Sequence, residues 1–377
     1  MSAEGYFNVN LILLLLFFMI KQLRFLLLPF SALYGLAISV RHYLYDQKLL
    51  LSKKFDIPLI VIGNLAVGGT GKSPMTEYLI RLLKDSFKVA TLSRGYGRKT
   101  TGFMYVEEED SAEMAGDEPL QFKCKYPDIT VAVSTDRVLG VNKLKDWHDV
   151  ILLDDALQHR ALVPGLSILL LEYSSLFQSR LLLPAGDFRD TYNRRKCADI
   201  IVISKSPTDL SEENRQKALM EVAAEAHQPV FFSYLKYGKP YRYIKAGHTI
   251  FKEEKDLEKG DAILVVSGIA NPAPLYDYVT PKVETVQKLS YRDHHLYSEK
   301  DISVIRERFD SIQATNKYIL TTEKDFQRLK GYIDSSALAN LPIYVVPIEA
   351  SFSREEADRF CSLILDYCKK GNNVETN

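Results

Sequence analysis

The loop AVGGTGKSP (66–74) directly follows the apolar run IPLIVIGNL (57–65) and precedes the helical pattern PMTEYLIRLLK. A strand, a glycine-rich turn and a helix start together direct backbone N–H groups at an anion, so this order favours an α/β fold with a phosphate at the turn. The strict pattern GxxxxGK[ST] fails at its first position, where Ala66 stands. The paired glycines that follow still supply backbone freedom close to the phosphates.

We predict that this loop binds a nucleoside triphosphate, with Lys72 supplying positive charge and Ser73 ligating Mg²⁺. A glycine-rich turn without a ligand is the alternative, and it leaves the lysine unexplained. The expected nucleotide-binding residues are Gly68, Gly69, Thr70, Gly71, Lys72 and Ser73.

Short β-branched apolar runs alternate with helical segments from residue 55 onward. Continuous apolar runs are typical of parallel strands that helices cover on both faces. We therefore expect a P-loop NTPase-like domain with a mainly parallel sheet and a second, smaller α/β/α domain. The expected divisions are an N-terminal membrane-associated helical segment (1–48), the P-loop domain (49–230), a two-stranded linker (231–260) and a C-terminal α/β domain (261–370).

Two apolar runs occupy the N-terminus, LILLLLFFMI (11–20) and FLLLPFSALYGLAISV (25–40). The second run would span ~24 Å as a helix, less than the ~30 Å hydrocarbon core, so we expect it to lie at a membrane surface or dip into it. A buried core helix is the alternative. No basic residue precedes the first run, which argues against a signal peptide. Met19 begins a more conventional start, so we expect residues 1–18 to be an extension.

A second acidic site is expected beside a phosphate loop, and the run DVILLDD (149–155) ends on Asp154 and Asp155. Carboxylates at this position hold the metal or its water, although such a pair can also cap a helix. Gln158 and His159 follow, where they can order water or phosphate oxygens. The base is expected to be adenine, because ISKSPTD (203–209) does not provide the [NT]KxD pattern that reads guanine.

Three further clusters indicate a second substrate. The basic loop LSRGYGRKTTG (92–102) suits a phosphate or sugar, or is merely a solvated loop. AGDEP (115–119) and YRDHHLYS (291–298) offer carboxylates and histidines that can accept a proton. Lysine plus arginine equals aspartate plus glutamate, so no global field points to nucleic acid. The four cysteines have neither CxxC nor zinc spacing and fit a reducing cytoplasm.

The chain resembles the tetraacyldisaccharide 4′-kinase family from about residue 22 to beyond residue 330. The motifs that carry the resemblance are FLLLPFSALYGL, GNLAVGGTGKSP, SRGYGR, GDEP, DDALQHR, LLPAGDFRD, SGIANP, DHHLY and TEKD. The resemblance implies transfer of the γ-phosphate of ATP, with Mg²⁺, to the 4′-hydroxyl of a tetraacylated glucosamine disaccharide 1-phosphate, which forms lipid IVA for lipid A. It also implies attachment to the cytoplasmic face of the inner membrane, as a monotopic protein or through one short N-terminal helix. No obligate protein partner is expected.

The resemblance also implies roles for single residues. An aspartate and a histidine act together as the base, which correspond here to Asp117 and His294, with His295 as the neighbouring alternative. Which of the pair finally holds the proton is open. The expected catalytic residues are Asp117, His294 and Lys72. The expected acceptor-binding residues are Ser93, Arg94, Gly95, Tyr96, Arg98, Gln158 and His159. The expected metal-binding residues are Ser73, Asp154, Asp155 and Asp190.

Two positions depart from the family pattern. Ala156 and Leu157 stand where glycine and phenylalanine are frequent, a change in packing. Asp190 stands where glutamate is usual, so its carboxylate is one methylene short and would reach a metal through water. Two other functions remain open at this point. One is a P-loop enzyme with a soluble substrate, and the other is a membrane-tethered ATPase that moves a protein partner.

Overall fold

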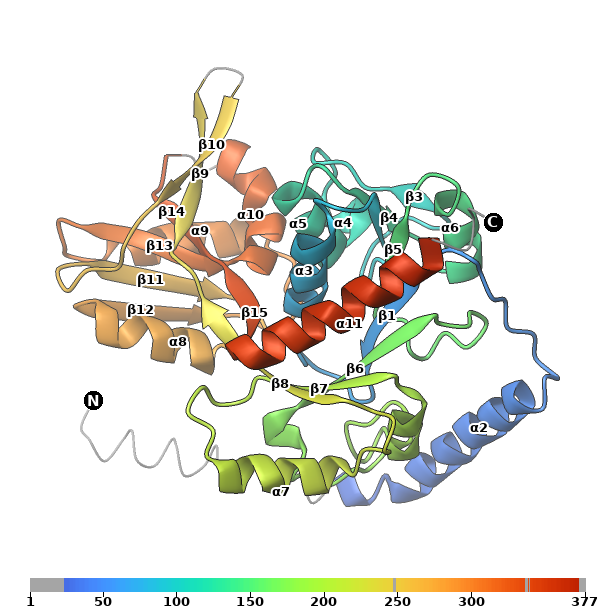
Figure 1. Ribbon diagram of the computed structural model, residues 1–377. Coiled ribbons are helices and arrows are strands. Elements are labelled where there is room, and N and C mark those ends of the chain that lie inside the picture. Colours follow the sequence, from blue (N-terminus) through green and yellow to red (C-terminus); the bar gives the residue numbers. More distant parts are fainter. Residues whose placement is uncertain (1–23, 247–248, 336–337, 339, 373–377) are drawn as a thin grey trace.

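The chain folds around two sheets that lie side by side (Figure 1). The computed structural model describes residues 24–246, 249–335, 338 and 340–372. The larger sheet has nine strands in the order β15-β8-β7-β6-β1-β5-β2-β4-β3. Only its edge strands β3 and β15 pair antiparallel, so the expected mainly parallel α/β sheet is confirmed. The strands are β1 (Leu59–Asn64), β2 (Val89–Ser93), β3 (Met104–Tyr105), β4 (Thr130–Val133), β5 (Val150–Asp154), β6 (Leu166–Glu172), β7 (Ile200–Ser204), β8 (Val230–Tyr237) and β15 (Ile348–Phe352).

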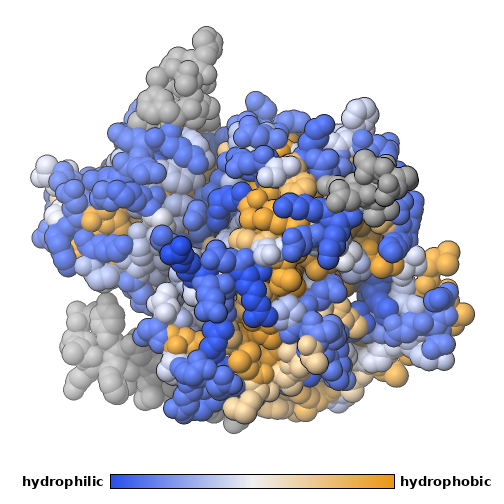
Figure 2. Space-filling model, viewed as in Figure 1, coloured by the Kyte–Doolittle hydropathy of each residue, from blue (hydrophilic) through white to orange (hydrophobic). Residues whose placement is uncertain are grey.

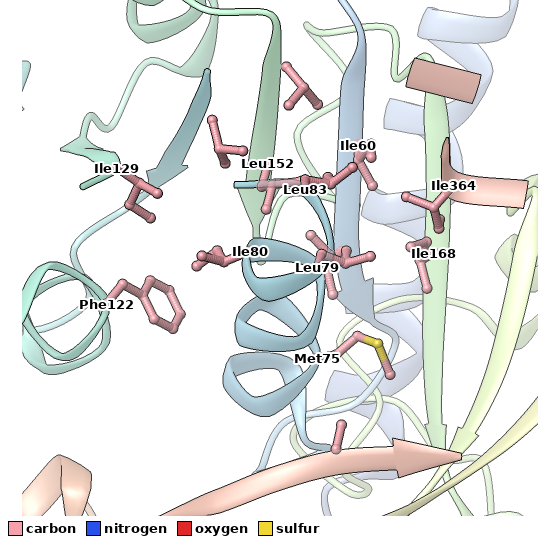
Figure 3. Close-up of a cluster of buried hydrophobic side chains, with 14 of the residues drawn as sticks. Ile60, Met75, Leu79, Ile80, Leu83, Phe122, Ile129, Leu152, Ile168 and Ile364 are labelled. Atoms are coloured by element: carbon pink, nitrogen blue, oxygen red, sulfur yellow. The ribbon is translucent and has the colours of Figure 1, made fainter. Parts of the chain in front are cut away.

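Helices cover both faces of this sheet. One face packs against Leu79 and Ile80 of α3, Phe122 of α5 and Ile364 of α11 (Figure 3). The other face packs against α6 and α7. These residues are apolar at helical spacing, so each helix buries one stripe against the strands. The helices are α3 (Lys72–Leu83), α4 (Ala112–Ala115), α5 (Asp117–Lys125), α6 (Arg137–Leu144), α7 (Glu212–Val222) and α11 (Arg354–Asn372), with short 3₁₀ turns at Tyr173–Ser175 and Tyr192–Cys197.

The smaller sheet has six strands in the order β10-β9-β14-β13-β11-β12. Helices α9 and α10 cover one face and α8 the other. Strands β9 and β10 form an antiparallel hairpin, which joins this sheet through β14. The elements are β9 (Tyr241–Ala246), β10 (Thr249–Glu254), β11 (Ala262–Ser267), α8 (Ala273–Val279), the 3₁₀ turn Thr280–Lys282, β12 (Thr285–Ser290), α9 (Glu299–Asp310), β13 (Lys317–Thr322), α10 (Glu323–Ser335) and β14 (Ile343–Val346).

The end of the chain returns to the larger sheet, which differs from the expected division at residues 261–370. Strand β15 pairs antiparallel with β8, and α11 buries Phe360 and Ile364 in the core of the first unit. The pairing covers the open edge of β8, and the apolar stripe of α11 finds its partner there rather than on the second sheet. The second unit therefore lies between β8 and β15 in the chain.

Helix α2 (Leu28–Asp46) lies apart from both sheets, along one edge of the larger unit (Figure 1). Its two buried residues, Ser31 and His42, are polar and face the protein. Ser31 Oγ donates to Leu182 O at 2.9 Å and accepts from Ala185 N at 2.9 Å, and Nε2 of His42 lies 2.8 Å from Oδ1 of Asp190. Within the residues described, no helix has the length and apolar content needed to cross a membrane. The run 11–20 and Met19 lie outside those residues.

Candidate active site

The glycine-rich loop connects β1 to α3, as its sequence predicts. Gly68 and Gly71 have φ of 105° and 86°, in the left-handed region where a side chain is strained. Asn64, the last residue of β1, donates from Nδ2 to Thr70 Oγ1 at 2.9 Å, and Ser204 Oγ donates to Thr70 O at 2.7 Å. These bonds fix the loop at the carboxyl ends of the strands, the edge at which open α/β sheets bind ligands.

Asp154 is the last residue of β5, the strand beside β1, and Asp155 follows it. Lys72 Nζ lies 3.8 Å from Oδ1 of Asp155, and Arg189 donates to both oxygens of the same carboxylate. Burial alone would raise the pKa of Asp155, but the hydrogen bonds from Arg189 hold it below its usual value. The loop lysine and the acidic strand end therefore meet, with an arginine that sequence reasoning did not single out.

Asp154 is more deeply buried than its neighbour. Its Oδ1 accepts from Thr76 Oγ1 at 3.2 Å, while its Oδ2 is buried and has no hydrogen-bond partner among the described residues. Burial and then the nearby charges of Glu118 and Asp155 raise the pKa of Asp154 to about 7. An orphaned carboxylate oxygen among like charges is an arrangement that a divalent cation relieves.

Glu118 extends this acidic cluster to the glycine-rich loop. Its Oε1 accepts from Ser73 Oγ at 2.8 Å and from Lys324 Nζ at 2.5 Å. Within the described part of the chain, no three His, Cys, Asp or Glu side chains are close enough to bind a metal by themselves. Mg²⁺ at a phosphate loop needs fewer protein ligands, because nucleotide oxygens and water complete its octahedral coordination. The oxygens of Ser73 and Asp154 fit such an ion.

Asp117 and His294 belong to different units of the fold and meet at this edge. Asp117 is the first residue of α5, and His294 follows β12 with a left-handed φ of 54°. His294 Nδ1 lies 3.0 Å from Oδ2 of Asp117. Burial would raise the pKa of Asp117, but hydrogen bonds from His294 and Arg328 hold it below its usual value. His295 turns away and contacts Asp301 at 3.1 Å.

A cavity of about 500 Å³ opens beside this pair. Its basic lining includes Arg41 of α2, Arg94 and Arg137, so an anionic group would be attracted to it. Burial and then Arg94 lower the pKa of Arg137 to about 10, and its Nε has no partner among the described residues. Burial and then Arg137 lower the pKa of His159, whose Nε2 is also unpaired in the described structure.

The structure brings most of the expected acceptor residues to this cavity. The expected site residues that line it are Ser93, Arg94, Gly95, Tyr96, Asp117, Asp154, Asp155, Gln158, His159, Asp190 and His294. Arg98 is not among them, because its guanidinium donates to Gly102 O at 2.5 Å within its own loop. Asp190 contacts His42 of α2 through Oδ1, so this oxygen ties α2 to the site.

Sequence reasoning assigned no role to several residues of the site. Asn64 and Arg189 lie inside two of the motifs that carry the resemblance, GNLAVGGTGKSP and LLPAGDFRD, and this was the available signal. Arg137 lies in none of those motifs. Lys324 and Arg328 lie in and just after TEKD, a motif to which no chemistry was attached. Their partners lie 206 and 211 residues away along the chain.

Known proteins share this architecture. The family model described as tetraacyldisaccharide-1-P 4′-kinase matches residues 23–368. A curated tetraacyldisaccharide 4′-kinase of Phocaeicola vulgatus is 40% identical over 351 residues, which cover 92% of this chain and 95% of the relative. The enzyme of the same name from Flavobacterium johnsoniae is 39% identical and covers 92% of this chain and 98% of its own.

A solved structure is also similar. The crystal structure of LpxK from Aquifex aeolicus in complex with ATP superposes with a TM-score of 0.70 at 30% identity. The match covers 92% of this chain and 99% of the crystallised one. The likeness therefore extends over both sheets and is not confined to the glycine-rich loop.

Proposed function

The chain belongs to the tetraacyldisaccharide-1-phosphate 4′-kinase family, and on that premise we propose how its residues carry out the transfer. The enzyme moves the γ-phosphate of ATP to the 4′-hydroxyl of a tetraacylated glucosamine disaccharide 1-phosphate, a step of lipid A biosynthesis. One observation supports this proposal most directly. The Asp117–His294 pair lies at the same sheet edge as the glycine-rich loop and the acidic end of β5.

The nucleotide is held by the loop between β1 and α3. Backbone N–H groups around Gly71 and the ammonium of Lys72 bind the β- and γ-phosphates. Ser73, Asp154 and Asp155 would hold Mg²⁺ or its water, and the ion would neutralise charge that builds up on the phosphate oxygens. Arg189 keeps Asp155 ionised and oriented toward Lys72.

The acceptor lies in the cavity next to the loop. Arg94 and Arg137 attract its 1-phosphate, and Asp117 with His294 receives the proton of the attacking hydroxyl. The hydroxyl oxygen bonds the γ-phosphorus, the bond from that phosphorus to the bridging oxygen breaks, and ADP leaves. Positioning and charge supply most of the rate in such transfers.

Helix α2 carries the enzyme to the membrane surface in this proposal. Its polar side contacts the protein, while large apolar side chains point outward, and Figure 2 shows hydrophobic residues at the edge where α2 and the segment after it lie. An apolar helix face with basic neighbours suits an anionic lipid surface. The exposed residues are Phe25, Leu26, Leu28, Phe30, Leu33, Leu36, Val40, Tyr43, Leu49, Leu50 and Leu51.

The test of the activity uses γ-labelled ATP, Mg²⁺ and the tetraacyl disaccharide 1-phosphate in mixed micelles. A labelled lipid phosphate that disappears in Asp117→Ala supports the proposal. Label on a water-soluble acceptor, independent of detergent, would favour a soluble-substrate enzyme. Hydrolysis of ATP without any phosphorylated product would favour an ATPase switch.

The test of the membrane surface uses flotation with vesicles of phosphatidylethanolamine and phosphatidylglycerol. The triple variant Phe30→Gln, Leu33→Gln, Leu36→Gln should lose most vesicle binding and retain its melting temperature, because these side chains are exposed. Unchanged flotation would remove α2 from the membrane role. Met220→Gln, exposed on α7, is the control.

A further inference from the structure

Arg328 of α10 reaches across the junction between the two sheets and contacts Asp117. Its Nε and Nη2 donate to Oδ2 of Asp117 at 2.8 and 2.5 Å. Its side chain is only 2% exposed, so these bonds form almost without competition from water. The guanidinium presents both groups in a fixed fork, and here both N–H groups converge on a single oxygen, so they fix the position of that oxygen and favour its negative charge.

All of these contacts fall on one oxygen of Asp117. His294 Nδ1 also lies against Oδ2, at 3.0 Å. Among the described residues none bonds Oδ1, and Asp117 lines the cavity. Because a carboxylate held by one oxygen keeps the lone pairs of the other, Oδ1 is the atom left for the hydroxyl of the acceptor.

The arginine is itself held by a buried frame built from two motifs that the proposed function leaves unused, SGIANP and TEKD. Its Nη1 donates to Gly268 O and to Oδ1 of Asp325, both at 3.1 Å. Asp325 Oδ2 accepts from Gly268 N at 3.0 Å, and Tyr297 donates to Asp325 Oδ1 at 3.2 Å. His294 N donates to the same Gly268 O at 3.2 Å.

The frame therefore positions both members of the pair. Gly268 O accepts from the side chain that holds Asp117 and from the backbone that carries His294. A Cβ on Gly268 would lie 3.0 Å from Oδ1 of Asp325 and 3.3 Å from Arg292 O, so a side chain here would press on the frame. A satisfied buried network of this kind rigidifies its members.

We propose that Arg328 is a positioning residue for the transfer, which pins Asp117 by Oδ2 and leaves Oδ1 directed at the acceptor hydroxyl. The proposal rests on the proposed kinase function. In the step itself the hydroxyl proton passes to Asp117 Oδ1 as the oxygen bonds the γ-phosphorus, and ADP departs. Such transfers need little proton transfer before the bond to the leaving group breaks, so an ionised and fixed carboxylate serves better than a strong base.

The charged groups around Asp117 determine how the loss of Arg328 would affect the pH profile of the reaction. Arg328 and Lys324 approach from α10 and His294 from the loop after β12, while Glu118 and Asp154 line the same cavity as Asp117. Loss of one cation from this set makes the protonated carboxyl easier to form. The acid limb of kcat/KM should therefore move to higher pH in Arg328→Met and less in Arg328→Lys, which keeps the charge but loses the fork.

The experiment compares Arg328→Met, Arg328→Lys and Asp117→Asn, singly and combined, in the labelled-lipid assay. Arg328→Met should lower kcat by about 100-fold with little change in the KM for ATP, as expected for a misplaced catalytic group. Because the arginine acts only through Asp117, adding Arg328→Met to Asp117→Asn should cost little more. Lys330→Met is the control, since Lys330 crosses the same junction but contacts Glu108 O and Cys124.

Several outcomes would overturn the proposal. These are an unchanged kcat in Arg328→Met, an acid limb that does not move, or losses that multiply in the double variant. If Arg328→Met does not fold by its melting curve, Arg328→Lys carries the same pH and double-variant comparisons. A wild-type enzyme without labelled product would instead refute the proposed function, so the two failures are distinguishable.

Discussion

At the scale of single residues, the site is organised by which carboxylates are neutralised and which are not. Asp117, Asp155 and Glu118 each accept from a cation, whereas Asp154 keeps one buried oxygen without a partner among the described residues. The site is thus prepared for one further positive charge, at the end of β5. That requirement has a consequence for stability that can be measured without substrate.

Asp154→Asn should stabilise the metal-free protein at high pH. Burial and then Glu118 and Asp155 raise the folded-state pKa of Asp154 to about 7. Between its unfolded value near 4 and pH 7 the folded state holds a proton that the unfolded state has lost, so this group's contribution to stability falls as pH rises. The amide removes that penalty, and we expect a melting temperature about 2–4 °C above wild type at pH 8 without Mg²⁺.

The same measurement at pH 5 provides the internal control, because there the wild-type carboxyl is also neutral and the difference should shrink. Asp149→Asn, at the opposite end of β5, should show neither effect. Equal melting temperatures for Asp154→Asn and wild type at pH 8 would contradict this reading of the acidic cluster. With Mg²⁺ and ATP present the order should reverse, since only the wild type gains from binding.

At the scale of elements, helix α11 packs in the core of the larger unit, although it follows the smaller unit in the sequence. Phe360 of α11 is fully buried and lies 5.2 Å from the ring of Phe231 and 4.8 Å from that of Phe352. Tyr78 of α3 joins this group, so the helix that begins at the nucleotide loop rests partly on the chain's end.

Phe360→Ala should therefore lower the stability of the larger unit. Removal of a fully buried ring costs about 3–5 kcal/mol through lost transfer energy and the cavity left behind. We expect a lower midpoint in urea, and weaker ATP binding as α3 loses support. Leu363→Ala, on the exposed side of the same helix, is the matched control and should change little. Equal midpoints for the two variants would place α11 outside the core.

At the scale of the whole molecule, a buried ionic cluster joins the two units beneath the site. Lys125 of α5 lies 2.6 Å from Glu77 of α3 and 2.8 Å from Glu323, the first residue of α10. Tyr241 of β9 donates to Glu323 at 3.1 Å. Burial and then Glu323 raise the pKa of Glu77 to about 7, and Lys125 lies between the two crowded carboxylates, with Arg81 3.8 Å from Glu77.

Lys125→Met should destabilise the protein by about 3–5 kcal/mol, because it removes the nearest cation from two buried carboxylates. The loss of stability should grow as pH rises from 5 to 8. The pKa of Glu77 is about 7, so its carboxyl becomes charged in that range and then needs the positive charge of Lys125. Urea unfolding at the two pH values measures this dependence. The double variant with Glu77→Gln should recover part of the loss, and a loss independent of pH would argue against the cluster.

The sequence predicted features whose signal is local. The glycine-rich loop, the acidic end of β5 and the continuous apolar strands are each read within about ten residues, and the structure has each where its pattern predicts. The return of β15 and α11 to the first sheet was not predicted, because periodicity indicates the type of an element and not its partner. Arg328 was missed for the same reason, since it lies 211 residues from Asp117 along the chain.

The chain crosses between the two units twice. The chain leaves the larger sheet after β8 and re-enters it at β15, and Gly238 N donates to Pro347 O at 2.9 Å, so both crossings lie side by side. The two covalent links therefore lie on one line, and a swing of one unit about that line would have to break the contacts that Arg328 and Lys125 make across the junction. A swing of that kind would change the gap between Asp117 and His294 while leaving the nucleotide loop intact. A hinge of this kind would let the enzyme keep its nucleotide bound while it contacts the lipid substrate only when the two units are closed.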